Sequence, residues 1–193
     1  MNRISAMTLP TSSSERIGRL FRYWTALRSS GGVPGIAAFD PLQVADLMPN
    51  LWMAGWKEDV GDFVYRVAGD AILTTNGRPM HRRSLHEIYP ECLAANLRDR
   101  FTRICAEPCA YHSTGTVYIR IGRYGVGERL ILPFLDRDGS GPVVLGCTDY
   151  RVISSADRSG TVPGEDDVEI RRFLTLDGDP IASEVAKVTS GSF

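Results

Sequence analysis

The first periodic pattern along the chain is a stripe of apolar residues spaced three and four positions apart. The stripe comprises Ile17, Leu20, Phe21, Trp24 and Leu27. This spacing places these side chains on one face of a helix that ends near Arg28. Ser12 and Glu15 have the spacing of a capping box, which predicts where the helix begins. The Ser29-Ser30-Gly31-Gly32 segment predicts its end.

A second helical segment leads into patterns typical of strands. Asp40 and Pro41 form an N-cap and first-turn pair that predicts a short helix, closed by Pro49. Apolar and polar residues then alternate on either side of a charged turn, which predicts a hairpin. Its first strand, turn and second strand cover residues 51–57, 58–62 and 62–68.

A long amphipathic helix follows several short apolar groups between residues 69 and 89. It begins at Pro90, ends at Pro108, and carries on one face Leu93, Leu97, Phe101 and Ile104. Strand-like runs come next, near residues 111–121, 128–135 and 143–152. After Ile153 the residues are mainly Ser, Asp and Gly, which is typical of a flexible segment, apart from one apolar patch at 168–176.

This order of elements predicts an α+β fold. It consists of a five-stranded antiparallel sheet covered by helices, preceded by the N-terminal amphipathic helix. The pattern by itself also permits other sheets with a helical cover, such as cystatin-like or ketosteroid-isomerase-like cones. A cone of the second kind would make the chain a small enzyme.

Short motifs in the first half of the chain distinguish these alternatives. They are Tyr23-Trp24, Leu27-Arg28, Asp40-Pro41-Leu42, Leu47-Met48-Pro49 and Phe63-Val64-Tyr65-Arg66-Val67-Ala68-Gly69. They resemble a bacterial subfamily of stand-alone PAS domains, the fifth PAS subfamily type. The resemblance continues through Gly77 and Ser84-Leu85 to the strand ending near Tyr150, about two thirds of the chain. It implies a PAS fold and a protein that senses or docks and does not catalyse.

The patterns divide the chain into four segments. They are a disordered N-terminus, a helical extension, the PAS domain and a flexible C-terminal tail, at residues 1–13, 14–48, 49–153 and 154–193. After Gly77, members of the PAS subfamily commonly have a second glycine, and Arg82 stands at that place here. Since arginine does not readily adopt a positive φ, we expect the loop to follow a different path.

Composition and charge limit the partners of this chain. The content of 43% hydrophobic and 23% charged residues is typical of a soluble globular protein. A net charge of −1 creates no field that would attract nucleic acid or anionic lipid. No run reaches the ~20 apolar residues of a membrane span, and the N-terminus does not resemble a signal peptide. We expect a cytoplasmic protein that binds neither nucleic acid nor membranes.

One group of residues has the composition of a zinc site. Cys105, Cys109 and His112 could supply three ligands, with Cys92 or Cys147 as the fourth. Because a helix ends between the first two, these side chains need not converge. Free cysteine is commonly buried as a small hydrophobic residue, so we predict core packing and no metal.

Two histidines lie in the segment where some PAS proteins bind haem. His86, beside Leu85 and Ile88, could face an apolar cavity, whereas His81 lies in a polar stretch. Residues 74–85 lack the cysteine of flavin-binding PAS domains. The sequence has no hydrolase elbow, phosphate loop or zinc-protease motif. We predict neither a cofactor nor catalysis.

The resemblance implies a pocket between the sheet and the short helices. The residues that it places there are Phe63, Tyr65, Leu73, Leu85, Leu97, Phe101, Leu132 and Thr148. Tyr65 and Thr148 would supply hydroxyl groups to a small ligand. Alternatively, these side chains fill a core, and the protein is a docking or dimerisation module without a ligand.

The N-terminal helix is the predicted interface. Its candidate anchors are Leu20, Phe21, Trp24 and Leu27, because large apolar side chains contribute most of the energy in interfaces. The expected partners are a second copy of the chain, giving a homodimer, and an unidentified signalling protein. The alternative is that this apolar stripe packs on the protein's own sheet.

Overall fold

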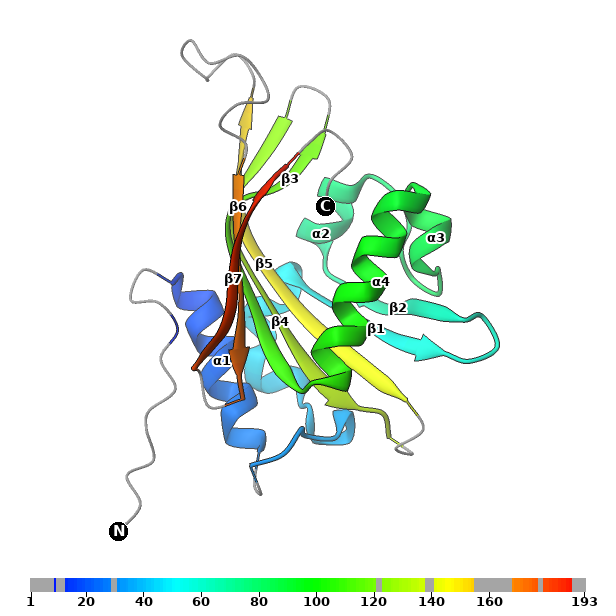
Figure 1. Ribbon diagram of the computed structural model, residues 1–193, viewed down its shortest axis with the longest axis vertical. Coiled ribbons are helices and arrows are strands. Elements are labelled where there is room, and N and C mark those ends of the chain that lie inside the picture. Colours follow the sequence, from blue (N-terminus) through cyan, green and yellow to red (C-terminus); the bar gives the residue numbers. More distant parts are fainter. Residues whose placement is uncertain are drawn as a thin grey trace.

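One antiparallel sheet runs through the structure and separates two groups of helices (Figure 1). The structure is a computed structural model that describes residues 9, 13–28, 31–120, 123–137, 141–154, 168–176 and 179–188. Among these residues, seven strands form the sheet in the order β2-β1-β5-β4-β3-β6-β7. They are β1 Leu51–Lys57, β2 Asp62–Ala68, β3 Cys109–Arg120, β4 Arg123–Leu135, β5 Pro142–Ser154, β6 Val168–Thr175 and β7 Pro180–Lys187.

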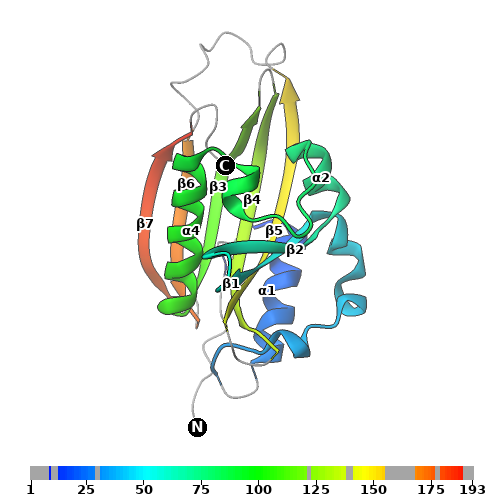
Figure 2. The same cartoon turned by 90° about the vertical axis from the view of Figure 1, so that its right-hand side faces the viewer.

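Helices cover both faces of the sheet (Figures 1 and 2). Helix α1 and the 3₁₀ helix η2 pack on one face, and α4 with the short helices α2 and α3 lies on the other. The bounds are α1 Glu15–Leu27, η1 Ile36–Ala38, η2 Pro41–Asn50, α2 Asp70–Asn76, α3 Leu85–Ile88 and α4 Glu91–Ala106. The α+β prediction is therefore confirmed.

The expected count of five strands is wrong, because β6 and β7 lie within the segment 154–193 expected as a flexible tail. β6 pairs with β3 along its length, from Cys109 opposite Thr175 onward. Phe173 and Leu174 are buried on opposite faces of the sheet. Phe173 belongs to the hydrophobic cluster between the sheet and α4, and Leu174 belongs to the cluster between the sheet and α1. Because both side chains are buried, β6 is a core strand of the sheet. The sequence shows only a short apolar patch in a polar segment, which is too little to predict this strand.

Helix α1 begins at a different serine from the one predicted. Ser14 is the N-cap, and its Oγ accepts a hydrogen bond from the backbone N–H of Ile17 at 3.3 Å. Ser12 lies outside the described residues. The second helical segment begins as predicted, with Asp40 accepting from the N–H of Leu42 at 3.0 Å, but it continues through Pro49 to Asn50.

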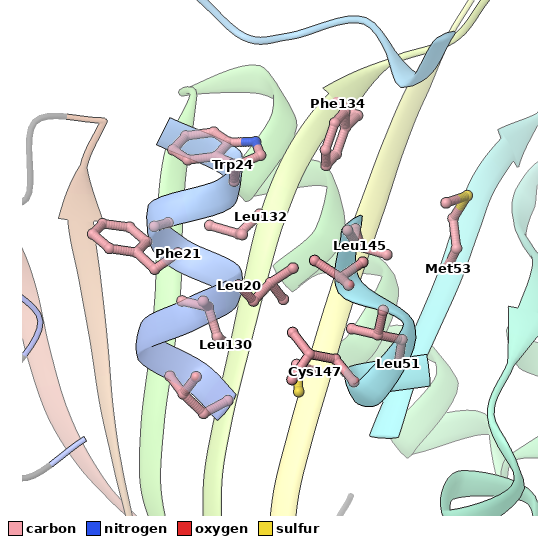
Figure 3. Close-up of a cluster of buried hydrophobic side chains, with 14 of the residues drawn as sticks. Leu20, Phe21, Trp24, Leu51, Met53, Leu130, Leu132, Phe134, Leu145 and Cys147 are labelled. Atoms are coloured by element: carbon pink, nitrogen blue, oxygen red, sulfur yellow. The ribbon is translucent and has the colours of Figure 1, made fainter. Parts of the chain in front are cut away.

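The apolar stripe of α1 is buried within the chain (Figure 3). Leu20 and Trp24 have no exposed surface, and Phe21 is 3% exposed. Trp24 contacts the sheet residues of this cluster, and its indole N–H donates to the carbonyl of Pro133 at 3.1 Å. The residues predicted as an interface therefore do not lie at the surface. Leu27, which is partly buried, packs against the same cluster.

This arrangement corresponds to the alternative in which the stripe packs on its own sheet. The physical reason is that β3, β4 and β5 present a second apolar face, on the side away from α4. That face includes Leu130, Leu132, Phe134, Leu145 and Cys147 (Figure 3). Covering it with α1 removes the apolar area of both from water.

Within the described part of the chain, no helix combines the length and the apolar character needed to cross a bilayer.

We expect Trp24→Ala to lower the free energy of unfolding by about 3–5 kcal/mol, because it removes a buried aromatic side chain and leaves the Pro133 carbonyl without its donor. Urea unfolding followed by circular dichroism measures this change. Arg22→Ala, on the exposed face of α1, is the matched control and should change stability by less than about 0.5 kcal/mol. Equal effects of the two substitutions would contradict the packing described here.

Candidate functional site

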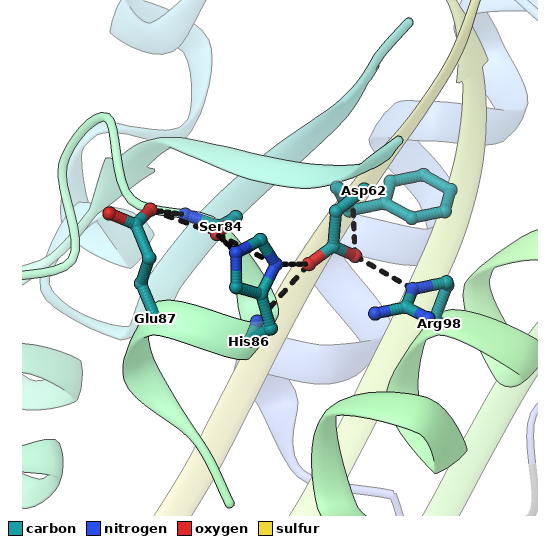
Figure 4. Close-up of polar contacts among 6 residues, drawn as sticks. Asp62, Ser84, His86, Glu87 and Arg98 are labelled. Carbon is teal, nitrogen blue, oxygen red and sulfur yellow. Dashed lines mark hydrogen bonds and ion pairs between the residues drawn. The ribbon is translucent and has the colours of Figure 1, made fainter. Parts of the chain in front are cut away.

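A buried carboxylate, that of Asp62, connects the start of β2 to α3 and α4 (Figure 4). Its side chain is 1% exposed. It accepts hydrogen bonds from the backbone N–H groups of Phe63 at 2.9 Å and His86 at 3.1 Å. The side chains of His86 and Arg98 donate to it at 2.9 and 3.0 Å. These bonds hold α3 and α4 against the sheet.

Burial by itself would raise the pKa of Asp62. The hydrogen bonds from Arg98 and His86 outweigh this effect and hold the pKa below that of an ordinary aspartate. The carboxylate is therefore ionised at neutral pH, and its negative charge strengthens each of these bonds.

The two histidines considered for haem have other partners. His86 donates to Asp62, and its side chain is 44% exposed. His81 lies at the surface, with its ring nitrogen 2.9 Å from the carbonyl oxygen of Arg66. Next to His86, Glu87 accepts from the N–H and the hydroxyl of Ser84, both at 2.8 Å, which caps α3. Both imidazoles thus point to polar surroundings.

A cavity of about 70 Å³ lies on the sheet face that α2 and α4 cover. Six aromatic side chains form much of its wall: Trp52, Tyr65, Tyr89, Phe101, Tyr118 and Tyr150. The other lining residues are Ile72, Thr75, Asn76, Met80, Leu97, Arg129, Ile131 and Thr148. An apolar wall with a small number of polar groups is typical of sites for small ligands.

Glycine shapes one wall of this cavity. Gly146 on β5 lies under the indole of Trp52, and a Cβ at this position would come within 2.1 Å of that ring. The missing side chain lets Trp52 lie close over the sheet, where its ring stacks on Phe101 with the centroids 5.5 Å apart. The aromatic wall therefore depends on a residue without a side chain.

The structure brings half of the predicted pocket residues to the cavity. Those that line it are Tyr65, Leu97, Phe101 and Thr148. Three others pack in the surrounding hydrophobic cluster without lining the cavity: Phe63, Leu73 and Leu85.

The placement of Leu132 in the pocket is wrong. Leu132 lies on the opposite face of the sheet, in the cluster that α1 covers (Figure 3). Side chains alternate along a strand, so Leu130 and Leu132 point to α1, whereas Arg129 and Ile131 line the cavity.

Hydroxyl groups supply most of the hydrogen-bonding capacity of the cavity. The hydroxyls of Tyr65 and Tyr89 are 3.3 Å apart, and the indole N–H of Trp52 donates to Thr148 Oγ1 at 3.3 Å. The Tyr150 hydroxyl donates to the carbonyl of Ala71 at 2.8 Å and contacts Thr75 Oγ1. Burial raises the pKa of Tyr65 well above its ordinary value, so this phenol stays protonated.

The sequence analysis missed Arg129 and all of the α2 residues in the wall. Arg129 is 8% exposed, and its guanidinium donates to the carbonyl of Val117. Its Nη1 lies 3.6 Å from Oε1 of the buried Glu169 on β6. The sequence pattern that could have identified Arg129 is the alternation along β4, which places Arg129 on the same face as Ile131. The partner Glu169 could not be found, because its segment was expected to be a tail.

The fold agrees with the comparison of the chain to known families. A model of the PAS domain family matches residues 11–149, which is well over half of the chain. The chain belongs to the PAS domain family. Neither curated proteins nor solved structures give a match to it. PAS domains are in general sensory and signalling modules and not catalysts.

The cysteine and histidine residues considered for zinc do not converge in this PAS domain. Cys109 packs in the cluster under α4, whereas His112 lies on the opposite face and contacts Glu128. Cys105 is partly buried on α4, with its thiol 3.9 Å from the carbonyl of Val143. No group of three or more His, Cys, Asp or Glu side chains in the described residues could hold a metal ion.

The loop next to the cavity contains a strained residue. Arg82 has φ = 61°, so it adopts the left-handed conformation despite its side chain. Its N–H donates to the carbonyl of Tyr65 at 2.8 Å, and the N–H of Tyr65 donates to the carbonyl of Arg83 at 3.0 Å. The expectation that Arg82 would avoid a positive φ is therefore wrong. Pairing with β2 holds the loop in this path.

We expect Arg82→Gly to raise the free energy of unfolding by about 0.5–1 kcal/mol, because glycine adopts this conformation without strain. Arg83→Gly is the matched control, since φ is not positive at this position, and it should lower stability by about 0.5–1 kcal/mol. Chemical denaturation of both variants tests the difference. Destabilisation by Arg82→Gly would show that the left-handed conformation is wrong.

We expect Asp62→Asn to lower the free energy of unfolding at pH 7 by about 1–3 kcal/mol, because the hydrogen bonds to the carboxylate lose their charge. The folded pKa is below the unfolded value of about 3.9, so this stabilisation is present above pH ~4 and is lost as the pH falls through the folded pKa. The difference between wild type and variant should therefore shrink toward pH 3 in urea titrations. Asp59→Asn, an exposed position of the same hairpin, is the control. A difference that stays constant with pH would exclude this explanation.

Proposed function

We propose that this chain is a cytoplasmic, non-catalytic sensory module that binds a small ligand in the cavity beneath α2 and α4. The cavity supports the proposal, because its aromatic wall carries a small number of hydroxyl groups and a buried cation. Its volume of about 70 Å³ is too small for a large cofactor. The ligand would then control how this PAS domain contacts a signalling protein or a second copy of itself.

The mobile part of the site would be α2. Helix α2 has no buried residue, yet Ile72, Thr75 and Asn76 line the cavity. In contrast, α4 contributes a row of buried side chains to the core. A ligand that contacts Thr75 or Asn76 would therefore order the helix that contributes no buried side chain, and a partner protein would respond to this change.

The chemistry of the thiols agrees with a role that does not include catalysis. Burial raises the pKa of Cys105 to about 12, that of Cys109 to about 11 and that of Cys147 to about 12. A nucleophilic cysteine requires a thiolate, so these three residues are unsuited to covalent catalysis at neutral pH.

A docking module without a ligand is the second candidate function. One observation favours it: β7 is an edge strand whose apolar residues Ile181 and Val185 are 50% and 69% exposed. An edge strand with exposed apolar residues can pair with a strand of another chain. Such pairing would also produce the expected homodimer. It would leave the cavity without a role.

A melting-temperature screen against a panel of small metabolites distinguishes the two functions. In the sensor function, at least one compound raises the melting temperature in proportion to its occupancy. If no compound shifts it and native mass spectrometry shows no bound molecule, the sensor function fails and the docking module is favoured.

We expect Tyr65→Phe to weaken binding of any compound found in this way by roughly threefold to tenfold, since a matched hydrogen bond contributes about 0.5–1.5 kcal/mol. Tyr23→Phe is the matched control, because Tyr23 bonds to Asp40 on the other side of the sheet. It should leave the affinity unchanged. Calorimetric titration measures both values, and an equal loss in the two variants would argue against the cavity as the site.

A further inference from the structure

We propose that the cavity takes a small organic anion, with its carboxylate bound at Arg129 and its apolar body between the aromatic walls. This inference rests on the proposed ligand-binding function and specifies the chemical class of the ligand. It follows from three features of the structure: a polar row across the sheet, an excess of buried positive charge, and a cavity wall that contains donors but no carboxylate.

The polar row crosses the face of the sheet that α2 and α4 cover. Arg129 on β4 is directly opposite Thr148 on β5 and Ser113 on β3. Ser113 is in turn opposite Arg171 on β6. Directly opposite side chains on one face are about 5 Å apart at Cβ, so the Arg129 guanidinium and the Thr148 hydroxyl can reach one bound group. Both residues line the cavity.

The positive charge around this row exceeds the negative charge. Arg129, Arg100 and Arg171 surround the buried carboxylate of Glu169. Arg171 donates to Glu169 at 2.7 Å and also to the exposed Glu184 at 3.3 Å. Among the described residues, three guanidinium groups thus share two carboxylates. A buried charge without a counter-charge is costly, which favours an added anion.

Arg100 shows this excess most clearly. It is 9% exposed, and its Nη1 is buried without a hydrogen-bond partner in the described part of the chain. Its guanidinium lies over the ring of Tyr111, 4.8 Å from the centroid. Burial lowers the pKa of Arg100, which means that its surroundings disfavour the positive charge.

The cavity wall offers donors to an anion. Thr148 Oγ1 accepts from Trp52, so its own proton is directed to another acceptor. The amide nitrogen of Asn76 is buried and has no partner among the described residues. None of the described lining residues is Asp or Glu, and the buried Glu169 contacts Arg129 from outside the cavity wall. The Arg129 contact to Glu169 is 3.6 Å, which is longer than a hydrogen bond.

Matched pairs of acid and amide test this inference on the wild-type protein. The probes are propionate with propionamide and benzoate with benzamide, titrated by ligand-detected NMR at constant ionic strength set with sodium chloride. We expect one acid to bind roughly tenfold to a hundredfold more tightly than its amide, as a charge-assisted hydrogen bond implies. Equal binding of acid and amide would overturn the anion inference and leave the ligand site in place.

Two variants locate the site. Arg129→Gln should remove the preference for the acid, whereas Arg19→Gln should keep affinity within about threefold, because Arg19 pairs with Asp46 on the other side of the sheet. An unchanged preference in Arg129→Gln would overturn the assignment. If circular dichroism shows that Arg129→Gln is unfolded, Thr148→Val decides the assignment, with an expected loss of roughly threefold to tenfold. An unchanged affinity in Thr148→Val would then overturn it.

The failure of the inference and that of the proposed function give different results. If neither acids nor amides bind, but a neutral compound from the metabolite panel does, the anion inference is wrong and the sensor function stands. If no compound of any charge binds, both are wrong.

Discussion

The alternation of side chains along β4 is the constraint on which both halves of this protein depend. Even-numbered residues Leu130, Leu132 and Phe134 face α1, and odd-numbered Arg129 and Ile131 face the cavity. Because the period of a strand is two, a shift of one position would exchange these two sets. It would place Arg129 under α1 and Leu132 in the cavity. The register of the sheet therefore fixes together which residues α1 covers and which residues line the cavity.

Two buried carboxylates attach the helices to this sheet, one on each face. Asp62 binds the backbone of α3 and the side chain of Arg98 on α4. On the other face, Glu128 accepts from the N–H of Ser14 at 2.7 Å and contacts His112. Burial would raise the pKa of Glu128, but these hydrogen bonds outweigh it and lower the pKa. Helix α2 is attached without a carboxylate, through the Tyr150 hydroxyl of β5, which donates to the carbonyl of Ala71 and contacts Thr75.

The C-terminal strands change the chemistry of the sheet as well as its width. β6 brings Glu169 beside Arg129 and Arg171, and so adds a carboxylate to the arginines on the sheet face that α2 and α4 cover. Phe173 from the same strand packs on Tyr111, with the ring centroids 5.3 Å apart. The matched part of the chain ends at residue 149, before these strands begin. The charged environment of the cavity thus combines residues inside the matched part of the chain with residues that follow it.

The sequence by itself determined the elements whose pattern is local. Amphipathic spacing located α1 and α4, alternation located the first hairpin, and short motifs led to the PAS family. The tertiary structure decided which partner each apolar face covers, and so placed Trp24 in a core and not in an interface. Only the tertiary structure shows that β6 and β7 extend the sheet, and that Arg129, Thr148 and the α2 residues line one cavity. Strand pairing and the packing of apolar faces depend on contacts between residues far apart in the chain. The periodicity of a single segment does not tell which other segments it contacts in space.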